Sequence, residues 1–340
     1  GLTRPELSVV LSYAKINLYN GLIDSQETLE DFLQIDPQRY FPTVLRRRYV
    51  DLIPGHRLSR EILATLIAND IVNRMGPAFV VRTQADTAAS FVTIARAYET
   101  ARIICRARPL HKDIEALDHV IPARAQLLMM FDISRTLRHV CLWLIEQYGE
   151  KLDIVQAVER LKDGMTRVYT RTGSYVSRAS NERMRKAQDK WMAMGVPEDL
   201  AHRVAVLTLT RAALDIVDVA ATRNRDVIDS ARLYAKFNDE LGLYWLHNTA
   251  EDLKVDGRWQ AQARTNLREH IYRLRRDLAL RLLKTRGKRD PRKIVEQWLT
   301  RREAQVRHYE DTIEEMKLRG KVDFATLSVA VQELEKLISS

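Results

Sequence analysis

The sequence predicts an all-α fold, a multi-helix antiparallel bundle-like array with short connections and no substantial sheet. Apolar residues recur at spacings of three and four over long stretches, which is the period of an α-helix. The glycines stand singly, and most of them follow the end of such a stretch, where a helix stops. No sustained alternation of apolar and polar residues indicates a strand, and no segment repeats at a fixed length.

The first predicted helix starts after Thr3. Thr3 and Glu6 have the spacing of a capping box, in which each side chain bonds to the backbone N–H of the other residue. Pro5 falls in the first turn, where its missing N–H does no harm. Gly21 is predicted to end the helix. One apolar stripe runs along it, formed by Leu7, Leu11, Ala14 and Leu18.

Similar patterns predict helices through the rest of the chain. They cover Arg60–Gly76, Asp86–Arg106, the stretch from Leu127 to Ile145 after Pro122, Pro197–Leu207, Arg225–Leu241, Trp259–Leu282, Pro291–Leu318 and Asp323–Ile338. Further glycines are predicted to stand at helix ends, namely Gly76, Gly149, Gly195, Gly287 and Gly320. The short run "FVV" at residues 79–81 fits a strand or a helix equally well.

Charge divides the chain into two parts. Residues 256–321 hold 19 Lys and Arg against 10 Asp and Glu, so +9 of the chain's net charge of +10 lies there. We therefore predict a helical core region at residues 1–256 and a basic helical segment at residues 257–340 that packs on it.

The composition is that of a folded, soluble protein, with 46% hydrophobic and 29% charged residues. No apolar run approaches the roughly 20 residues that a membrane span needs. The first residues, "GLTRPELS", lack the zones of a signal peptide, so we expect a cytoplasmic protein without a membrane partner. Cys105 and Cys141 are too few for a disulfide framework and are predicted to be buried thiols.

Motifs that carry common enzyme chemistry are missing from the sequence. The glycines do not fit the G-x-G-x-x-G or P-loop spacing that cradles phosphates, and there is no H-E-x-x-H zinc motif. A Ser, His and Asp triad stays open, but there is no G-x-S-x-G motif to support one. We therefore predict no catalytic, cofactor-binding or metal-binding residue in this chain.

The helix "REILATLIANDIVNRMG" carries polar residues in line. Thr65, Asn69 and Asn73 recur every four positions, while Asp70 and Arg74 have the spacing of an ion pair. The side opposite the three polar residues is apolar, which suggests a helix buried on both faces. A buried amide must be hydrogen-bonded, because an unpaired one costs about 1–3 kcal/mol. These five residues are our candidate inter-helix or inter-domain contacts, and an internal network and a docked domain remain equal alternatives.

The basic segment allows a different function. "RLRRD" from Arg273 and "KTRGKRD" from Lys284 offer charges that neutralise phosphates, so an independent helical protein that binds nucleic acid or another polyanion is the alternative. Acidic residues are interleaved with these arginines at helical spacings that suit ion pairs. This pattern favours a solvated helix face, and we do not expect nucleic acid as a partner.

Four stretches resemble the C-terminal region of the large bacterial NAD-dependent glutamate dehydrogenases. They are "GLTRPELSVVLSYAKINLYNGLIDS", "REILATLIANDIVNRMGPAF", "ALDIVDVA" and "RWQAQARTNLR". The first two are specific, and the resemblance runs from Gly1 to about Arg276. The interpretation of Thr285–Ser340 rests on its helical pattern alone.

The resemblance implies a parent enzyme that converts L-glutamate, NAD and water to 2-oxoglutarate, ammonium and NADH. In that family the NAD-binding fold and the catalytic residues belong to a domain upstream of this region. The chain is then expected to be inactive alone and to have a structural, domain-docking or oligomer-organising role. Its expected partners are the upstream catalytic domain of the same polypeptide and further copies in a homo-oligomer.

Overall fold

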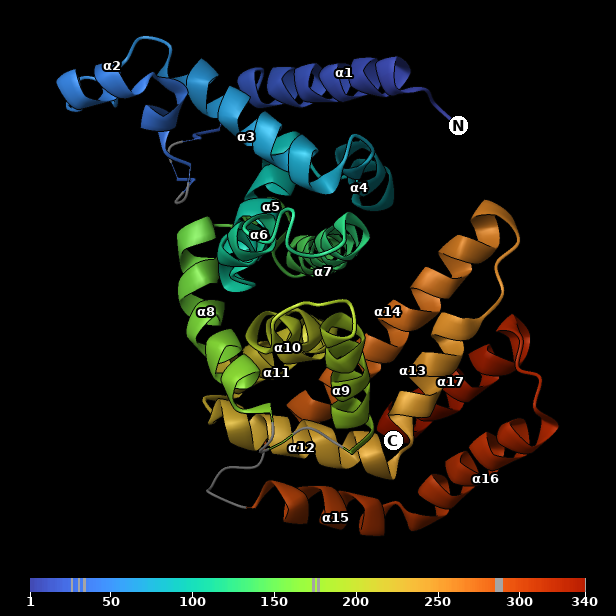
Figure 1. The fold of residues 1–340 in the computed structure, drawn as a ribbon. Helices are drawn as coiled ribbons and strands as arrows, with labels where there is room; N and C mark the ends of the chain where they lie inside the picture. The colour runs from blue at the N-terminus through green and yellow to red at the C-terminus, as the bar shows by residue number, and fades with distance from the viewer. Residues whose placement is uncertain are drawn as a thin grey trace. The chain divides into compact units, whose positions relative to one another are not determined.

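The computed structural model describes residues 1–25, 27–29, 31–32, 35–172, 175, 178–284 and 290–339. All regular elements in these ranges are helices, and none of the described residues lies in a strand, so the predicted all-α fold is confirmed (Figure 1). Within the same ranges, no helix combines the length and the apolar character that crossing a bilayer would require.

The chain forms two compact units, which are described separately. Unit 1 consists of Gly1–Asp163 and Ala187–Arg211, and unit 2 consists of Gly164–Lys186 and Ala212–Ser340. The chain passes between them within three helices, namely α8 (Ile154–Thr170), α9 (Arg178–Met192) and α11 (Thr210–Arg223). The boundary predicted between residues 256 and 257 falls inside unit 2. It was predicted from the distribution of charge along the chain, and it remains a prediction.

Unit 1 is built around one central helix. Its helices are α1 (Arg4–Ile23), α2 (Thr43–Arg48), α3 (Ser59–Met75), α4 (Phe79–Thr87), α5 (Phe91–Ile104), α6 (Ala107–Glu115), α7 (Ala123–Tyr148) and α10 (Glu198–Val206), with short 3-10 turns at Pro37–Tyr40, Gly149–Lys151 and Leu207–Leu209. Nearly every residue of α5 is buried, because α1, α3, α4, α6 and α7 all contact it. The core of unit 1 therefore lies along α5.

The start of α1 matches its prediction, whereas its end does not. The hydroxyl of Thr3 accepts from the N–H of Glu6, and the carboxylate of Glu6 accepts from the N–H of Thr3, which completes the capping box. Gly21 does not end the helix, which continues to Ile23. A Cβ atom at Gly21 would lie 2.2 Å from the ring of Phe91. This glycine is present because α1 and α5 approach closely there.

Other boundaries follow the sequence in part. Gly76, Gly149, Gly195 and Gly320 have positive φ angles just beyond helices or turns, as predicted, and Gly287 lies outside the described residues. The helix predicted at Asp86–Arg106 is wrong at its start, because α4 runs to Thr87 and Ser90 caps a new helix there. The run "FVV" is the beginning of α4.

Unit 2 contains α12 (Val227–Glu240), α13 (Leu243–Asp252), α14 (Gly257–Leu282), α15 (Pro291–Arg301), α16 (Glu303–Arg319) and α17 (Phe324–Ser339). The single helix predicted at Pro291–Leu318 is wrong, because the chain bends at Arg302. The cause is tertiary packing, since α15 contacts α12 while α16 contacts α17, and one straight helix does not reach both.

Candidate functional site

The polar stripe on α3 lies on a partly open face. The buried side of the helix includes Ile67 and Ile71, whereas Thr65 and Asn69 are half-buried and Asn73 is exposed. The hydroxyl of Thr65 donates to the carbonyl of Glu61 at 2.7 Å, within its own helix. In the described part of the chain, no hydrogen bond joins the side-chain amide of Asn69 or Asn73 to another residue. The prediction that both faces of this helix are buried is therefore wrong at Asn73.

Asp70 connects α3 to α5 through buried charges. Its carboxylate accepts hydrogen bonds from the hydroxyl of Tyr98 at 2.9 Å and from Arg102 at 2.8 Å. Arg102 also donates to Glu99 at 2.5 Å, and the side chains of Arg102 and Glu99 are 6% and 1% exposed. Charges at this depth persist only when they are paired, because desolvation of each one is costly. Asp70 is thus an inter-helix contact of unit 1.

Arg74 contacts a different helix. Its guanidinium donates to the Glu115 carboxylate of α6 at 2.6 Å. The pair predicted between Asp70 and Arg74 is not among the ion pairs of the described residues, because each group has a partner on a neighbouring helix instead. The structure therefore joins Asp70 and Arg74 to α5 and α6, and it leaves Thr65, Asn69 and Asn73 outside this cluster.

His111 of α6 is buried close to these charges. Burial, and then the positive charge of Arg74, lowers the pKa of His111 to about 4. The imidazole is therefore neutral at neutral pH. Burial likewise raises the pKa of the Cys141 thiol well above its usual value, and Cys105 and Cys141 are both buried and reduced, as predicted. These groups are held in neutral forms that suit a core rather than acid–base or nucleophilic chemistry.

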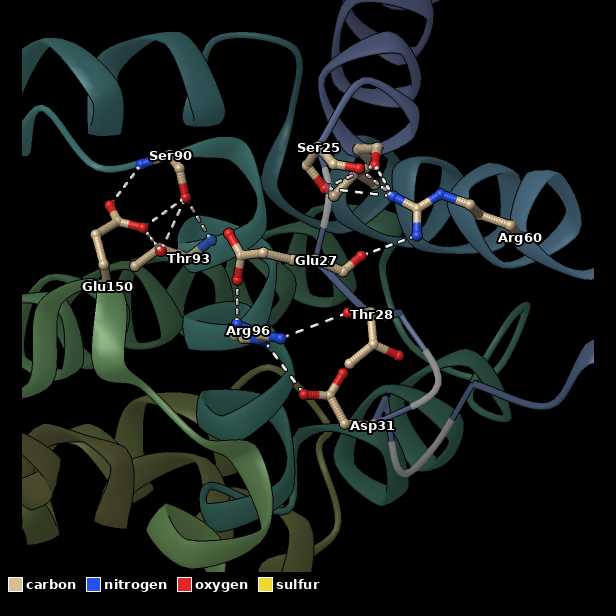
Figure 2. Close-up of polar contacts among 10 residues, drawn as sticks. Ser25, Glu27, Thr28, Asp31, Arg60, Ser90, Thr93, Arg96 and Glu150 are labelled. Atoms are coloured by element: carbon tan, nitrogen blue, oxygen red, sulfur yellow. Dashed lines mark hydrogen bonds and ion pairs between the residues drawn. The ribbon is translucent and has the colours of Figure 1, made fainter.

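Arg60, in the first turn of α3, holds the segment that follows α1 (Figure 2). Its guanidinium donates to the backbone carbonyls of Leu22 at 3.0 Å, Ser25 at 2.6 Å and Glu27 at 2.8 Å. The carbonyls at the end of a helix have no partner within it, and a guanidinium supplies several donors in a fixed plane. Arg60 therefore fixes the direction in which the chain leaves α1.

Arg96 ties the same segment to the central helix. It lies on α5, is mostly buried, and forms ion pairs with Glu27 and with Asp31, the second at 3.2 Å between Nε and the carboxylate. Figure 2 shows the Arg96 guanidinium between these two carboxylates and the carbonyl of Thr28. The connection between α1 and α3 is thus bonded to both α3 and α5.

Glu150 binds the N-terminus of α5. Its carboxylate accepts hydrogen bonds from the N–H of Ser90 at 3.0 Å, from the Ser90 hydroxyl at 2.8 Å and from the Thr93 hydroxyl (Figure 2). Burial alone would raise the pKa of Glu150, but the hydrogen bonds from Thr93 and Ser90 outweigh it and hold the pKa below its usual value. A negative charge at a helix N-terminus is also favoured by the helix dipole.

These networks have a structural character. The charged groups in them bond to a helix end, to the segment after α1 or to an opposite charge of unit 1. Among the described residues, no three His, Cys, Asp or Glu side chains gather closely enough to hold a metal ion. The arrangement can fix helices relative to one another and so present a rigid surface.

No sequence pattern points to Arg60, Arg96 or Glu150. Their partners lie between 33 and 69 residues away along the chain, so no helical spacing connects them. A helix-capping pattern at Ser90 was the one local feature available, and it points to the helix start without identifying the carboxylate that binds there.

Comparison with known proteins places the chain in a family. The family model described as glutamate dehydrogenase, C-terminal, matches residues 1–336. The NAD-specific glutamate dehydrogenase of Halomonas elongata is 33% identical over the whole chain, and that of Pseudomonas aeruginosa is 30% identical over the whole chain. The enzyme of the same name from Mycobacterium tuberculosis is 27% identical over 99% of the chain.

These matches extend the resemblance beyond Arg276, because the family model continues to residue 336. The chain spans 21% of the length of each of these relatives. It belongs to the glutamate dehydrogenase C-terminal family.

Proposed function

We propose that this chain works as the non-catalytic C-terminal helical region of a large NAD-dependent glutamate dehydrogenase. The parent enzyme would convert L-glutamate, NAD and water to 2-oxoglutarate, ammonium and NADH, with NAD bound in an upstream catalytic domain. The observation that carries the proposal is the family match over residues 1–336, together with the fifth of each relative's length that the chain covers. The relatives' printed name supplies the reaction.

The structure supports an organising role for this region. Several charged groups of unit 1 bond helices to their neighbours, as with Arg60 at the end of α1 and Arg102 between Asp70 and Glu99. Such networks position helices in one geometry but add no reacting group. We propose that unit 1 serves as a rigid support for the catalytic domain or for the homo-oligomer, in the cytoplasm.

The test is an assay of glutamate-dependent NADH formation. The full-length polypeptide that contains this chain should form NADH from glutamate and NAD, while the purified 340-residue chain should form none. Turnover by the 340-residue chain, free of contaminating enzyme, would overturn the non-catalytic assignment. A full-length polypeptide without this activity would overturn the assignment of the parent reaction.

The polyanion-binding alternative loses much of its basis in the structure of α14. Arg275 is buried, donates to the carbonyl of Leu243 and lies over the rings of Tyr244 and Tyr272. Arg276 is paired with Asp218 of α11. The predicted solvated face is wrong at Arg275, whose role is in the core of unit 2. Salt-sensitive binding of DNA or RNA by the chain would restore the alternative.

A further inference from the structure

Helix α1 has two apolar faces, and unit 1 covers the C-terminal part of one of them. Leu18 and Leu22 are fully buried where α1 packs on α3 and α5. Val9, Tyr13 and Ile16 are 55%, 69% and 54% exposed. At 100° per residue these three side chains lie nearly opposite Leu18 and Leu22 around the helix axis. We call Val9, Tyr13 and Ile16 the outer stripe.

The outer stripe is unlike a scatter of single exposed apolar residues, which is normal on a protein surface. Its members follow one another at spacings of four and three, so they form one continuous strip. Between Val9 and Ile16 the one charged residue is Lys15, which falls about 130° away around the axis. A helix that is apolar on two opposite sides has the pattern of one that is buried between two neighbours.

The capping box shows that α1 begins at Arg4 as a helix of its own. The backbone at Thr3 is extended, with φ −73° and ψ 164°, and Thr3 and Glu6 satisfy each other's N–H groups. The chain before Thr3 therefore leaves the helix axis rather than prolonging the helix. Leu2, just before this point, is 62% exposed. A segment that precedes Thr3 is therefore free to fold back on α1 instead of extending it.

We infer that the outer stripe of α1 is the docking surface for the part of the same polypeptide that precedes Gly1 in the full-length protein. The inference rests on the proposed function. The matched family model describes a C-terminal region, and the chain accounts for 21% of its relatives' length, so most of the parent chain would lie before α1. A tethered segment has an effective concentration in the millimolar range, which favours it over a second copy as the occupant. The expected occupant is an apolar helix or strand face.

Hydrogen–deuterium exchange tests the inference directly. We expect the amides of residues 6–16 to exchange about tenfold or more slowly in the full-length polypeptide than in the 340-residue chain, because docking adds protection to that of the helix itself. Equal exchange rates in the two proteins would overturn the inference.

A charged variant and a matched control sharpen this test. Tyr13→Glu places one charge in the outer stripe, and Ser8→Glu places one on an exposed side of the same helix outside it. In the full-length polypeptide, Tyr13→Glu should restore the faster exchange of α1, and Ser8→Glu should not. In the 340-residue chain, neither change should alter the midpoint of unfolding. Unchanged protection in full-length Tyr13→Glu would contradict the docking surface.

The occupant is identified by a photo-cross-linking residue at position 13 in a mixture of isotopically heavy and light full-length chains. Links within one chain to residues before Gly1 support the inference. Links between a heavy and a light chain, or no links above those from a matched probe at the exposed Glu159, overturn it. NADH formation from glutamate is measured on the same sample. If the full-length protein forms NADH but lacks the expected links, the docking surface is wrong and the proposed function stands. If it forms no NADH, the result counts against the proposed function.

Discussion

Two helices of unit 1, α5 and α1, are both rich in apolar residues but have different surroundings. Neighbouring helices surround α5, and its buried charges are paired internally. The buried residues of α1 are Leu18 and Leu22, and the outer stripe is exposed. Apolar content therefore does not decide burial by itself. The contrast distinguishes residues that stabilise this chain from exposed residues that are available for a partner. Four predictions test this distinction.

The largest effect is expected at the buried charges of α5. Arg102→Met should lower the free energy of unfolding by about 3–5 kcal/mol, because it removes the positive charge that pairs with the buried carboxylate of Glu99. The matched control is Arg138→Met, which removes a surface pair with Asp86 and should cost under about 1 kcal/mol. Urea unfolding measures both. Similar losses in the two variants would mean that the burial of the α5 cluster contributes nothing special.

The second prediction concerns the side of α1 that is packed. Gly21→Ala should destabilise the chain by about 1–3 kcal/mol, since the new Cβ would overlap the ring of Phe91. Gly55→Ala is the control, because the nearest atom to a Cβ there is 3.9 Å away. Thermal unfolding of both variants gives the comparison. A harmless Gly21→Ala would show that α1 and α5 do not approach as closely as described.

The third prediction uses pH to probe the cluster beside α5. The unfolded chain protonates His111 near its usual pKa of 6.5, but the folded chain protonates it only near its pKa of about 4. The stability present above pH 6.5 is therefore lost as the pH falls through this window. Between pH 7 and pH 5 this residue should account for a loss of roughly 2 kcal/mol. His111→Gln should remove that part of the pH dependence.

The control for this prediction is His119→Asn. The side chain of His119 is exposed and its φ is 62°, a conformation that Asn tolerates. This variant should keep the full pH dependence in urea unfolding between pH 7 and pH 5. If His111→Gln behaves in the same way as His119→Asn, the histidine is not held neutral by burial.

The smallest effect is expected on the open face of α3. Asn69→Leu and Asn73→Leu should change the free energy of unfolding of the 340-residue chain by less than about 0.5 kcal/mol, because neither amide bonds to another described residue. Calorimetry of each variant checks this. A clear loss of stability would show that these side chains belong to an internal hydrogen-bond network. Impaired assembly of the full-length polypeptide alone would extend the docking surface to α3.

Local patterns predicted much of this fold. The capping box at Thr3 needs only a four-residue window, and the long helices α7 and α14 repeat an apolar stripe for several turns. Helix α9 was not predicted, because its sequence "RASNERMRKAQDKWM" carries few apolar residues to show a period. The bend at Arg302 was not predicted either, because no glycine or proline stands there. The bend follows from the different helices that α15 and α16 contact.

The candidate site was less predictable for the same physical reason. Asp70 and Arg74 have the spacing of an ion pair on one helix, yet each finds a partner on another helix. The contacts of Arg60 are with backbone carbonyls, which every residue possesses and no sequence pattern distinguishes. The sequence of α1 is apolar on both sides, so the sequence does not distinguish the outer stripe from the side that packs on unit 1.

The central claim is that this chain is one part of a much larger dehydrogenase polypeptide. An immunoblot of the source cells, with an antibody raised against this chain, tests it most directly. The account predicts a band several times larger than 39.4 kDa. A single band near 39.4 kDa would contradict it, because the helical protein would then stand alone and the outer stripe would need a different neighbour.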